Sequence, residues 1–201
     1  MKVAVIGTGH IGGTLGAKWR AAGHEVTYGS RQADGAGGAG SGGEPQTGPG
    51  GAPLRSVGDA VAGAGVVVLA VPAGAVASVV AEHGTALDGK IVVDATNRMG
   101  AKHTDSQNAI RACGPRVQYV RAFNTYGWEN FADPLPGTTL FFAADPAARA
   151  AAEELISAAG LEPAYVGGED ATDAVNGVAA LWMSLVQQRG GQRRLALRLL
   201  G

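Results

Sequence analysis

The first 22 residues hold the feature that most constrains the fold of this chain. Residues 2–6 (KVAVI) form a short apolar run that leads into a glycine motif, and an alanine-rich amphipathic stretch follows it. A strand that runs into Gly-x-Gly-x-x-Gly and then a helix is the dinucleotide-binding fingerprint in the context that it requires. We expect pyrophosphate to bind the free N–H groups at the start of this helix. The motif consists of Gly7, Thr8, Gly9, His10, Ile11 and Gly12.

The end of the next expected strand indicates which dinucleotide binds. Residues 25–28 lead into Gly29, Ser30 and Arg31, and the nearest acid, Asp34, lies beyond the strand end. A site that prefers NAD usually places an acid here for the ribose 2′-hydroxyl, whereas a hydroxyl and a guanidinium suit a 2′-phosphate. The alternative is a solvated loop arginine beside a turn serine. We therefore predict NADP(H) rather than NAD(H).

Composition narrows the class of protein. The 201 residues suit a single domain, 1–201, and a formal net charge of −1 argues against nucleic-acid or membrane-surface partners. The single cysteine, Cys113, favours a reducing cytosol, and we expect it to pack rather than react. A chain that opens on its first strand leaves no room for a signal peptide. We expect a cytoplasmic protein, and the abundance of Ala, Gly and Arg is typical of bacterial sequences.

Strand and helix patterns alternate along the chain, which predicts a Rossmann-type α/β fold with a doubly wound parallel sheet. A short α/β C-terminal extension ends in a helix. Residues 34–53, rich in glycine, predict a flexible loop, and residues 170–200 predict a helical segment bordering the second substrate. Further strands are expected at 66–70, 91–94, 117–121, 138–143 and 163–166, and helices at 56–62, 75–83, 105–112 and 146–159.

The carboxyl ends of parallel strands are where ligands bind in such a sheet. Small or hydrogen-bonding residues follow each predicted strand there. Beyond the glycine motif and Ser30-Arg31, these residues are Val71, Pro72 and Ala73, then Thr96 and Asn97, and finally Phe123, Asn124, Thr125 and Tyr126.

These motifs together resemble the NADPH-dependent coenzyme F420 reductase family. The similarity rests on Gly-Thr-Gly-His-Ile-Gly, Gly-Ser-Arg, Ala-Val-Pro, Asp-Ala-Thr-Asn and Ala-Phe-Asn-Thr, and on a C-terminal helix with Leu-Trp followed by glycines. The chain also looks similar to the oxidoreductase domain of the STEAP metalloreductases and to the N-terminal halves of pyrroline-5-carboxylate reductases.

The resemblance implies a role for each of these segments. Thr8, His10 and Ile11 would line the pyrophosphate turn, and Val71, Pro72 and Ala73 would flank the nicotinamide ribose. Asn97, Asn124 and the segment with Gly190 would border the deazaflavin. Coenzyme F420 would be a co-substrate that exchanges a hydride with the nicotinamide, with no catalytic acid–base triad. The resemblance also favours a homodimer.

Other residues have two interpretations. Trp128 could stack on a flat ring, whereas a core position is expected for Trp182 and a structural cap for Asp94. Arg189, Arg193 and Arg194 could meet the acidic tail of coenzyme F420, or form a solvated basic helix end.

No histidine pair has metal-ligand spacing, so we predict no metal site. Two other functions stay open. One is an NADPH-dependent reductase of an imine, a carbonyl, a flavin or a ferric chelate. The other is a non-catalytic NADP(H) sensor.

Overall fold

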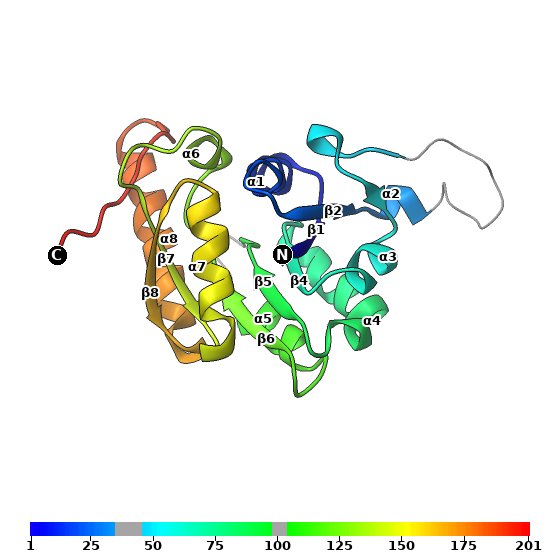
Figure 1. The fold of residues 1–201 in the computed structure, drawn as a ribbon. Coiled ribbons are helices and arrows are strands. Elements are labelled where there is room, and N and C mark those ends of the chain that lie inside the picture. Colours follow the sequence, from blue (N-terminus) through cyan, green and yellow to red (C-terminus); the bar gives the residue numbers. More distant parts are fainter. Residues whose placement is uncertain (35–45, 98–103) are drawn as a thin grey trace.

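The computed structural model describes residues 1–34, 46–97 and 104–201. Eight strands form one sheet in the order β3-β2-β1-β4-β5-β6-β7-β8 (Figure 1). All neighbouring strands are parallel except β6 and β7. The strands are β1 (Lys2–Ile6), β2 (Glu25–Gly29), β3 (Leu54–Arg55), β4 (Val66–Leu69), β5 (Ile91–Asp94), β6 (Gln118–Arg121), β7 (Thr139–Ala144) and β8 (Glu162–Gly167).

The α-helices connect these strands and lie on both faces of the sheet. They are α1 (His10–Ala21), α2 (Arg31–Asp34), α3 (Val57–Ala62), α4 (Val76–Leu87), α5 (Thr104–Arg111), α6 (Trp128–Ala132), α7 (Arg149–Ala158) and α8 (Thr172–Gln188). The order reverses between β1 and β4, which is the switch point where a doubly wound sheet opens a crevice. The predicted fold class is therefore confirmed.

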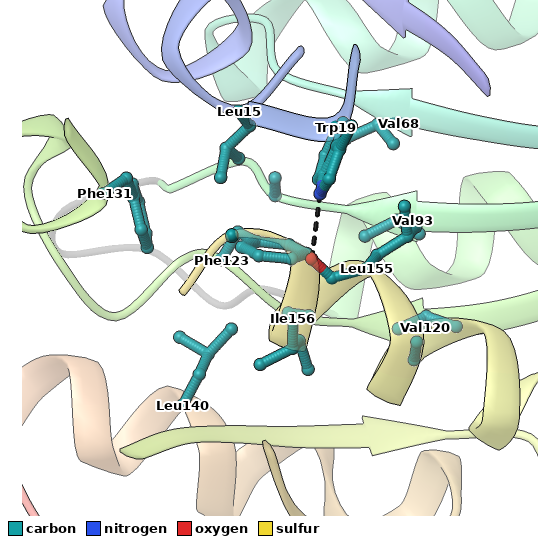
Figure 2. Close-up of a cluster of buried hydrophobic side chains, with 14 of the residues drawn as sticks. Leu15, Trp19, Val68, Val93, Val120, Phe123, Phe131, Leu140, Leu155 and Ile156 are labelled. Atoms are coloured by element: carbon teal, nitrogen blue, oxygen red, sulfur yellow. Dashed lines mark hydrogen bonds between the residues drawn. The ribbon is translucent and has the colours of Figure 1, made fainter. Parts of the chain in front are cut away.

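Two apolar clusters cover the two faces of the sheet, as the alternation of side chains along a strand requires. Val3 and Val5 pack on the face that carries α1, whereas Ala4 and Ile6 pack on the face that carries α3 and α4. Trp19 of α1 is fully buried and its Nε1 donates to the carbonyl oxygen of Leu155, 2.9 Å away (Figure 2). This contact joins α1 to α7.

The C-terminal part differs from expectation in two respects. β7 runs antiparallel to β6, so the sheet is not parallel throughout, and α7 and α8 lie on opposite faces of β7 and β8 (Figure 1). The expected helical segment 170–200 is helical only from Thr172 to Gln188, after a 3-10 turn at Glu169–Ala171. Gly190 and Gly191 have φ of +64° and +87°, a backbone that ends the helix, and residues 192–201 contain no helix or strand.

Residues 46–53, the described end of the predicted flexible loop 34–53, are more ordered than the sequence suggested. Residues 35–45 lie outside the described part of the chain. Pro49–Gly51 forms a 3-10 helix, Ala52 is fully buried, and β3 then pairs with β2. The backbone N–H of Tyr28 donates to the Pro53 carbonyl oxygen at 2.8 Å. Residues 46–53 are thus packed against β2 and α1, a tertiary contact that low-complexity composition does not reveal.

Candidate active site

The turn between β1 and α1 has the shape that a pyrophosphate requires. Gly7 has φ of +114°, which side-chain-bearing residues rarely adopt, and an added Cβ would lie 2.5 Å from the Ala70 carbonyl oxygen. At Gly12 an added Cβ would overlap the Gly7 carbonyl oxygen, whereas at Gly9 it would meet no described atom within 4 Å. The turn therefore packs closely on its protein side and is open at Gly9, as a bound anion demands.

The start of α1 is electrostatically suited to that anion. The N-cap residue, Gly9, makes no side-chain capping bond, and no acidic residue occurs in the first turn of this described helix. The first N–H groups of a helix and its dipole attract negative charge. Nothing on this helix competes with a phosphate for these donors.

A cavity of about 300 Å³ lies beside this turn, at the carboxyl ends of β1, β2 and β4. Seven of the predicted cofactor residues line it: Gly7, Thr8, Gly9, Ser30, Arg31, Val71 and Pro72. The other predicted residues of this group begin helices, His10, Ile11 and Gly12 in α1 and Ala73 in the 3-10 turn Ala73–Ala75. Ser30 and Arg31 therefore line the same cavity as the glycine turn.

Helix α4 supplies a wall of this cavity that the sequence motifs did not predict. Ser78, Glu82 and His83 line it, and Glu82 Oε2 lies 3.7 Å from His83 Nε2. The signal that could have found two of them is the spacing of Ser78 and Glu82, since residues four apart share one helix face, and α4 follows a strand that borders the crevice.

His10 and Trp128 join the glycine turn to the expected acceptor side. Their rings stack with centroids 5.0 Å apart and an interplanar angle of 21°. Trp128 is the first residue of α6 and is 38% exposed, so part of its face is free to contact another ring. By contrast, Trp182 is buried and its Nε1 donates to the Leu195 carbonyl oxygen at 2.7 Å, which confirms its core position.

The remaining acceptor candidates gather after β5 and β6. Asn97 Nδ2 donates to the Asn124 carbonyl oxygen at 3.0 Å, and Asn124 and Thr125 are each 2% exposed. Phe123, between β6 and this pair, has φ of +62°, a strained value for a residue with a side chain. Its ring packs edge-on against Trp19 in the core, so this backbone turn separates a core side chain from the polar pair (Figure 2).

Gly190 is the remaining predicted acceptor residue, and it follows α8. Asn124 contacts Asn176, in the second turn of α8, through Nδ2 and Oδ1 3.4 Å apart. Gly190 follows the other end of that helix, 14 residues later in sequence, which is about 20 Å along a helix axis. The resemblance implied that Gly190 borders the acceptor, and this stays a prediction.

A buried ion pair that the sequence did not predict lies at the ends of β5 and β6. Asp94 Oδ1 lies 3.1 Å from Arg121 Nη1, and both side chains are fully buried. Asp94 also accepts from the backbone N–H of Thr96 at 3.0 Å, so it caps the following loop as expected. Tyr119 donates to the same carboxylate, and burial, with the Asp94 charge, raises the pKa of its phenol well above the usual value.

The C-terminal arginines have acidic partners within the chain. Arg193 Nε lies 3.0 Å from Glu129 Oε1, and Arg194 Nη2 lies 2.5 Å from Asp133 Oδ2. These contacts join the end of the chain to α6 and favour the structural interpretation of both residues.

Cys113 is not suited to a catalytic role. The Cys113 thiol lies 3.5 Å from the Ala109 carbonyl oxygen, and burial raises its pKa, which disfavours a reactive thiolate. No cluster of His, Cys, Asp and Glu in the described ranges could hold a metal ion. None of the described helices is long and apolar enough to cross a membrane.

Comparison with solved structures identifies the fold and its relatives. A protein from Arthrobacter sp. FB24, provisionally assigned as an F420-dependent NADP reductase, is 25% identical with a TM-score of 0.81, and the alignment covers 100% of both chains. A hypothetical protein from Sinorhizobium meliloti is 27% identical, with a TM-score of 0.63 and coverage of 84% of this chain and 85% of its own.

A reductive aminase from Aspergillus terreus, solved with NADPH4, cyclohexanone and allyl amine, shares the fold at 20% identity and a TM-score of 0.70. The alignment covers 94% of this chain but only 62% of the aminase. No curated protein matches the sequence.

The sequence of residues 2–98 matches the profile of one protein family, described as NADP oxidoreductase, coenzyme F420-dependent. This range contains the glycine turn, the Ser30-Arg31 strand end, the cavity and Asn97. Together with the structural neighbours, the match indicates an NADP-dependent oxidoreductase. Residues 2–98 of this chain are therefore similar to the family of coenzyme F420-dependent NADP oxidoreductases.

Proposed function

We propose that the protein transfers a hydride between NADPH and coenzyme F420. The observation that carries the proposal is the position of Ser30 and Arg31 in the strand-end cavity of a domain that matches this family. When bound, NADPH supplies a hydride from the nicotinamide C4, and the deazaflavin accepts it at C5. NADPH, F420 and one proton give NADP⁺ and reduced F420.

The residues of this chain position the two substrates rather than react with them. Ser30 and Arg31 bind the 2′-phosphate, and the N–H groups at the start of α1 bind the pyrophosphate. Val71 and Pro72, which line the cavity after β4, would support the nicotinamide ribose. Holding two rings in contact supplies most of what a direct hydride transfer requires.

The second substrate is expected over the far side of the same edge. Trp128 offers a partly exposed indole face, and Asn97, Asn124 and Thr125 offer hydrogen-bonding groups there. The ends of neighbouring strands are about 5 Å apart, so a ring over β5 and β6 is within reach of a nicotinamide over β4.

A second candidate is an NADPH-dependent reductase of another acceptor, such as an imine or a carbonyl. The observation in its favour is the ion pairing of Arg193 and Arg194 with Glu129 and Asp133, which leaves those two guanidinium groups engaged within the protein. An F420 phosphate and glutamate tail would then need other basic contacts. This candidate keeps the same cofactor site and changes only the second substrate.

The test is to mix the purified protein with NADPH and oxidised F420 and to follow loss of the deazaflavin absorbance, with NADH as the control. Rapid loss with NADPH and slow loss with NADH is the expected result. If NADPH binds but F420 is not reduced, the second candidate replaces the first. Imines, small carbonyls, flavins and ferric chelates are then compared as acceptors by NADPH oxidation.

A further inference from the structure

Several buried polar atoms beside the expected acceptor side lack a partner within the described protein. They are Asn124 Oδ1 and Thr125 Oγ1, after β6, and Asn176 Nδ2 and Thr172 Oγ1, from the first two turns of α8. Asn124, Thr125 and Thr172 are at least nine-tenths buried. A buried polar atom without a hydrogen-bond partner is destabilising, so four of them on two segments that touch through Asn124 and Asn176 point to a ligand.

The orientation of the two amides follows from a single arginine. Arginine only donates hydrogen bonds, so the atom of Asn176 that lies 2.9 Å from Arg121 Nε is its oxygen. The same Oδ1 lies 3.4 Å from Asn124, which therefore presents its Nδ2 there. Two atoms are left without a partner: a donor, Asn176 Nδ2, and an acceptor, Asn124 Oδ1. The contacts with Arg121 establish which atom of each amide is the nitrogen and which is the oxygen.

The guanidinium that sets this orientation is itself immobilised. Arg121 Nη1 donates to the carbonyl oxygens of Asp94 and Thr96, at 3.2 and 2.8 Å, and pairs with the Asp94 carboxylate. Desolvation offsets much of the stability that a buried ion pair provides, but the pair restrains the positions of its two side chains. Here that geometry is transmitted to the two asparagines.

We propose that Asn176 and Asn124 form an amide clamp that binds the amide edge of a redox ring. Asn176 Nδ2 donates to the ring's carbonyl oxygen, and Asn124 Oδ1 accepts from its adjacent N–H. Two groups have this chemistry in the proposed reaction, on which this inference rests: the carboxamide of nicotinamide and the imide edge of a deazaflavin. Asn176 is thus a substrate-binding residue, and Arg121 is a positioning residue behind it.

The position of the amide clamp in the sheet agrees with this assignment. β6 lies three strands from β1, about 14 Å along the sheet, on the side of the switch point opposite β2 and its cavity. Adenosine over β2 and a redox ring near β6 therefore occupy opposite ends of one crevice. The strained backbone of Phe123 directly precedes Asn124, as is common where a site imposes a geometry.

The test uses the Asn176→Asp variant, which keeps Oδ1 beside Arg121 and replaces only the donating Nδ2. The matched control is Asn108→Asp, the same chemical change at an exposed position of α5. Three dissociation constants are measured for each protein: NADP⁺ and 2′-phospho-ADP-ribose (which lacks nicotinamide) by calorimetry, and oxidised F420 by fluorescence. Thermal unfolding verifies the fold.

Two results support the amide clamp and identify its ligand. Binding of NADP⁺ weakened about 10-fold or more, with 2′-phospho-ADP-ribose unchanged, assigns the nicotinamide carboxamide. Binding of F420 weakened to the same extent, with NADP⁺ unchanged, assigns the imide edge. Unchanged affinity for both ligands in a folded variant overturns the proposal. If the wild-type protein binds no F420, the proposed function fails, and the NADP⁺ measurement alone decides the amide clamp.

If Asn176→Asp does not fold, the proposal is tested with the wild-type protein and modified ligands. The acetylpyridine analogue of NADP⁺ replaces the carboxamide NH₂ with a methyl group, and an N3-methylated deazaflavin removes the imide N–H. The wild-type protein is expected to bind one of these analogues about 10-fold more weakly than its parent, because Asn124 Oδ1 would face a methyl group. Equal affinity for both analogues and their parents would refute the amide clamp.

Discussion

Asp94 Oδ1 and Arg121 Nη1 lie 3.1 Å apart at the carboxyl ends of β5 and β6, and neither side chain is accessible to solvent. The two residues are direct partners in the register of these strands. Removing one member of such a pair leaves an uncompensated buried charge, whereas removing both leaves none. The pair therefore affects both stability and the geometry of the site.

The first prediction concerns this pair. Arg121→Leu is expected to lower the free energy of unfolding by about 3–5 kcal/mol, because Asp94 loses its counter-charge in the core. The double variant Asp94→Asn, Arg121→Leu is expected to lose less. Urea unfolding measures both, with Arg116→Ala, which breaks an exposed ion pair with Asp88, as the control. A double variant less stable than the single one would contradict this account.

The second prediction concerns cofactor choice. Arg31→Ala is expected to weaken NADPH binding about 10- to 100-fold and to leave NADH binding unchanged, because one charge-assisted contact to a phosphate contributes about 1.5–3 kcal/mol. Arg31→Lys keeps the charge without the forked geometry and is expected to be intermediate. Calorimetric titration measures these affinities, with Arg149→Ala on α7 as the control. Equal losses for the two cofactors would remove Arg31 from the 2′-phosphate site.

The third prediction separates two glycines of the fingerprint. Gly9 has φ of −70° and space for a side chain, so Gly9→Ala is expected to fold normally but to lose NADPH affinity by about 10-fold or more. Gly12→Ala is expected to unfold at a lower temperature, because its Cβ would overlap the Gly7 carbonyl oxygen. Thermal unfolding and NADPH titration distinguish them. Normal NADPH binding by Gly9→Ala would place the pyrophosphate elsewhere.

The fourth prediction concerns Trp128. Trp128→Ala is expected to lower acceptor turnover about 3- to 10-fold, the magnitude of one aromatic contact, with little change in NADPH affinity. Trp128→Phe keeps a ring beside His10 and is expected to retain most activity. Steady-state kinetics and calorimetry test the two effects separately. Unchanged turnover in the alanine variant would exclude Trp128 from the acceptor side.

The fifth prediction concerns pH. Burial, and then the Met1 ammonium 3.0 Å from Nδ1, lowers the pKa of His24 below its usual value, while Glu154 opposes this shift. The unfolded chain therefore binds a proton more tightly than the folded one, so stability decreases as pH falls through about 6.5 toward the lower folded pKa.

This pH effect is measured as the change in unfolding free energy between pH 7.5 and 5.5. His24→Gln, which does not titrate, is expected to lose less stability on acidification than the wild-type protein. An identical pH dependence for the two proteins would show that other groups cause the change.

Local sequence determined the elements of the cofactor side. The order strand, glycine turn and helix is contiguous in the chain, and Ser30 and Arg31 follow the next strand directly, so both could be placed from their neighbours alone. The helix and strand bounds differ from prediction by a few residues at most places, since hydrophobic periodicity marks the centre of an element better than its ends. The exceptions are α2, α6 and β3, which were not predicted; the two residues of β3 follow a glycine-rich stretch and pair with β2.

Only the tertiary structure decided which distant residues meet. Asp94 and Arg121 are 27 positions apart and become partners through the pairing of β5 with β6, while Asn176 reaches Asn124 because α8 packs back on the sheet. Likewise, Arg193 meets Glu129 only after the chain has passed α8. Such contacts depend on strand order and helix direction, which are set by the burial of the whole apolar core. Periodicity and motif spacing describe a segment and its neighbours, and they contain no information about which remote side chain a buried polar group will find.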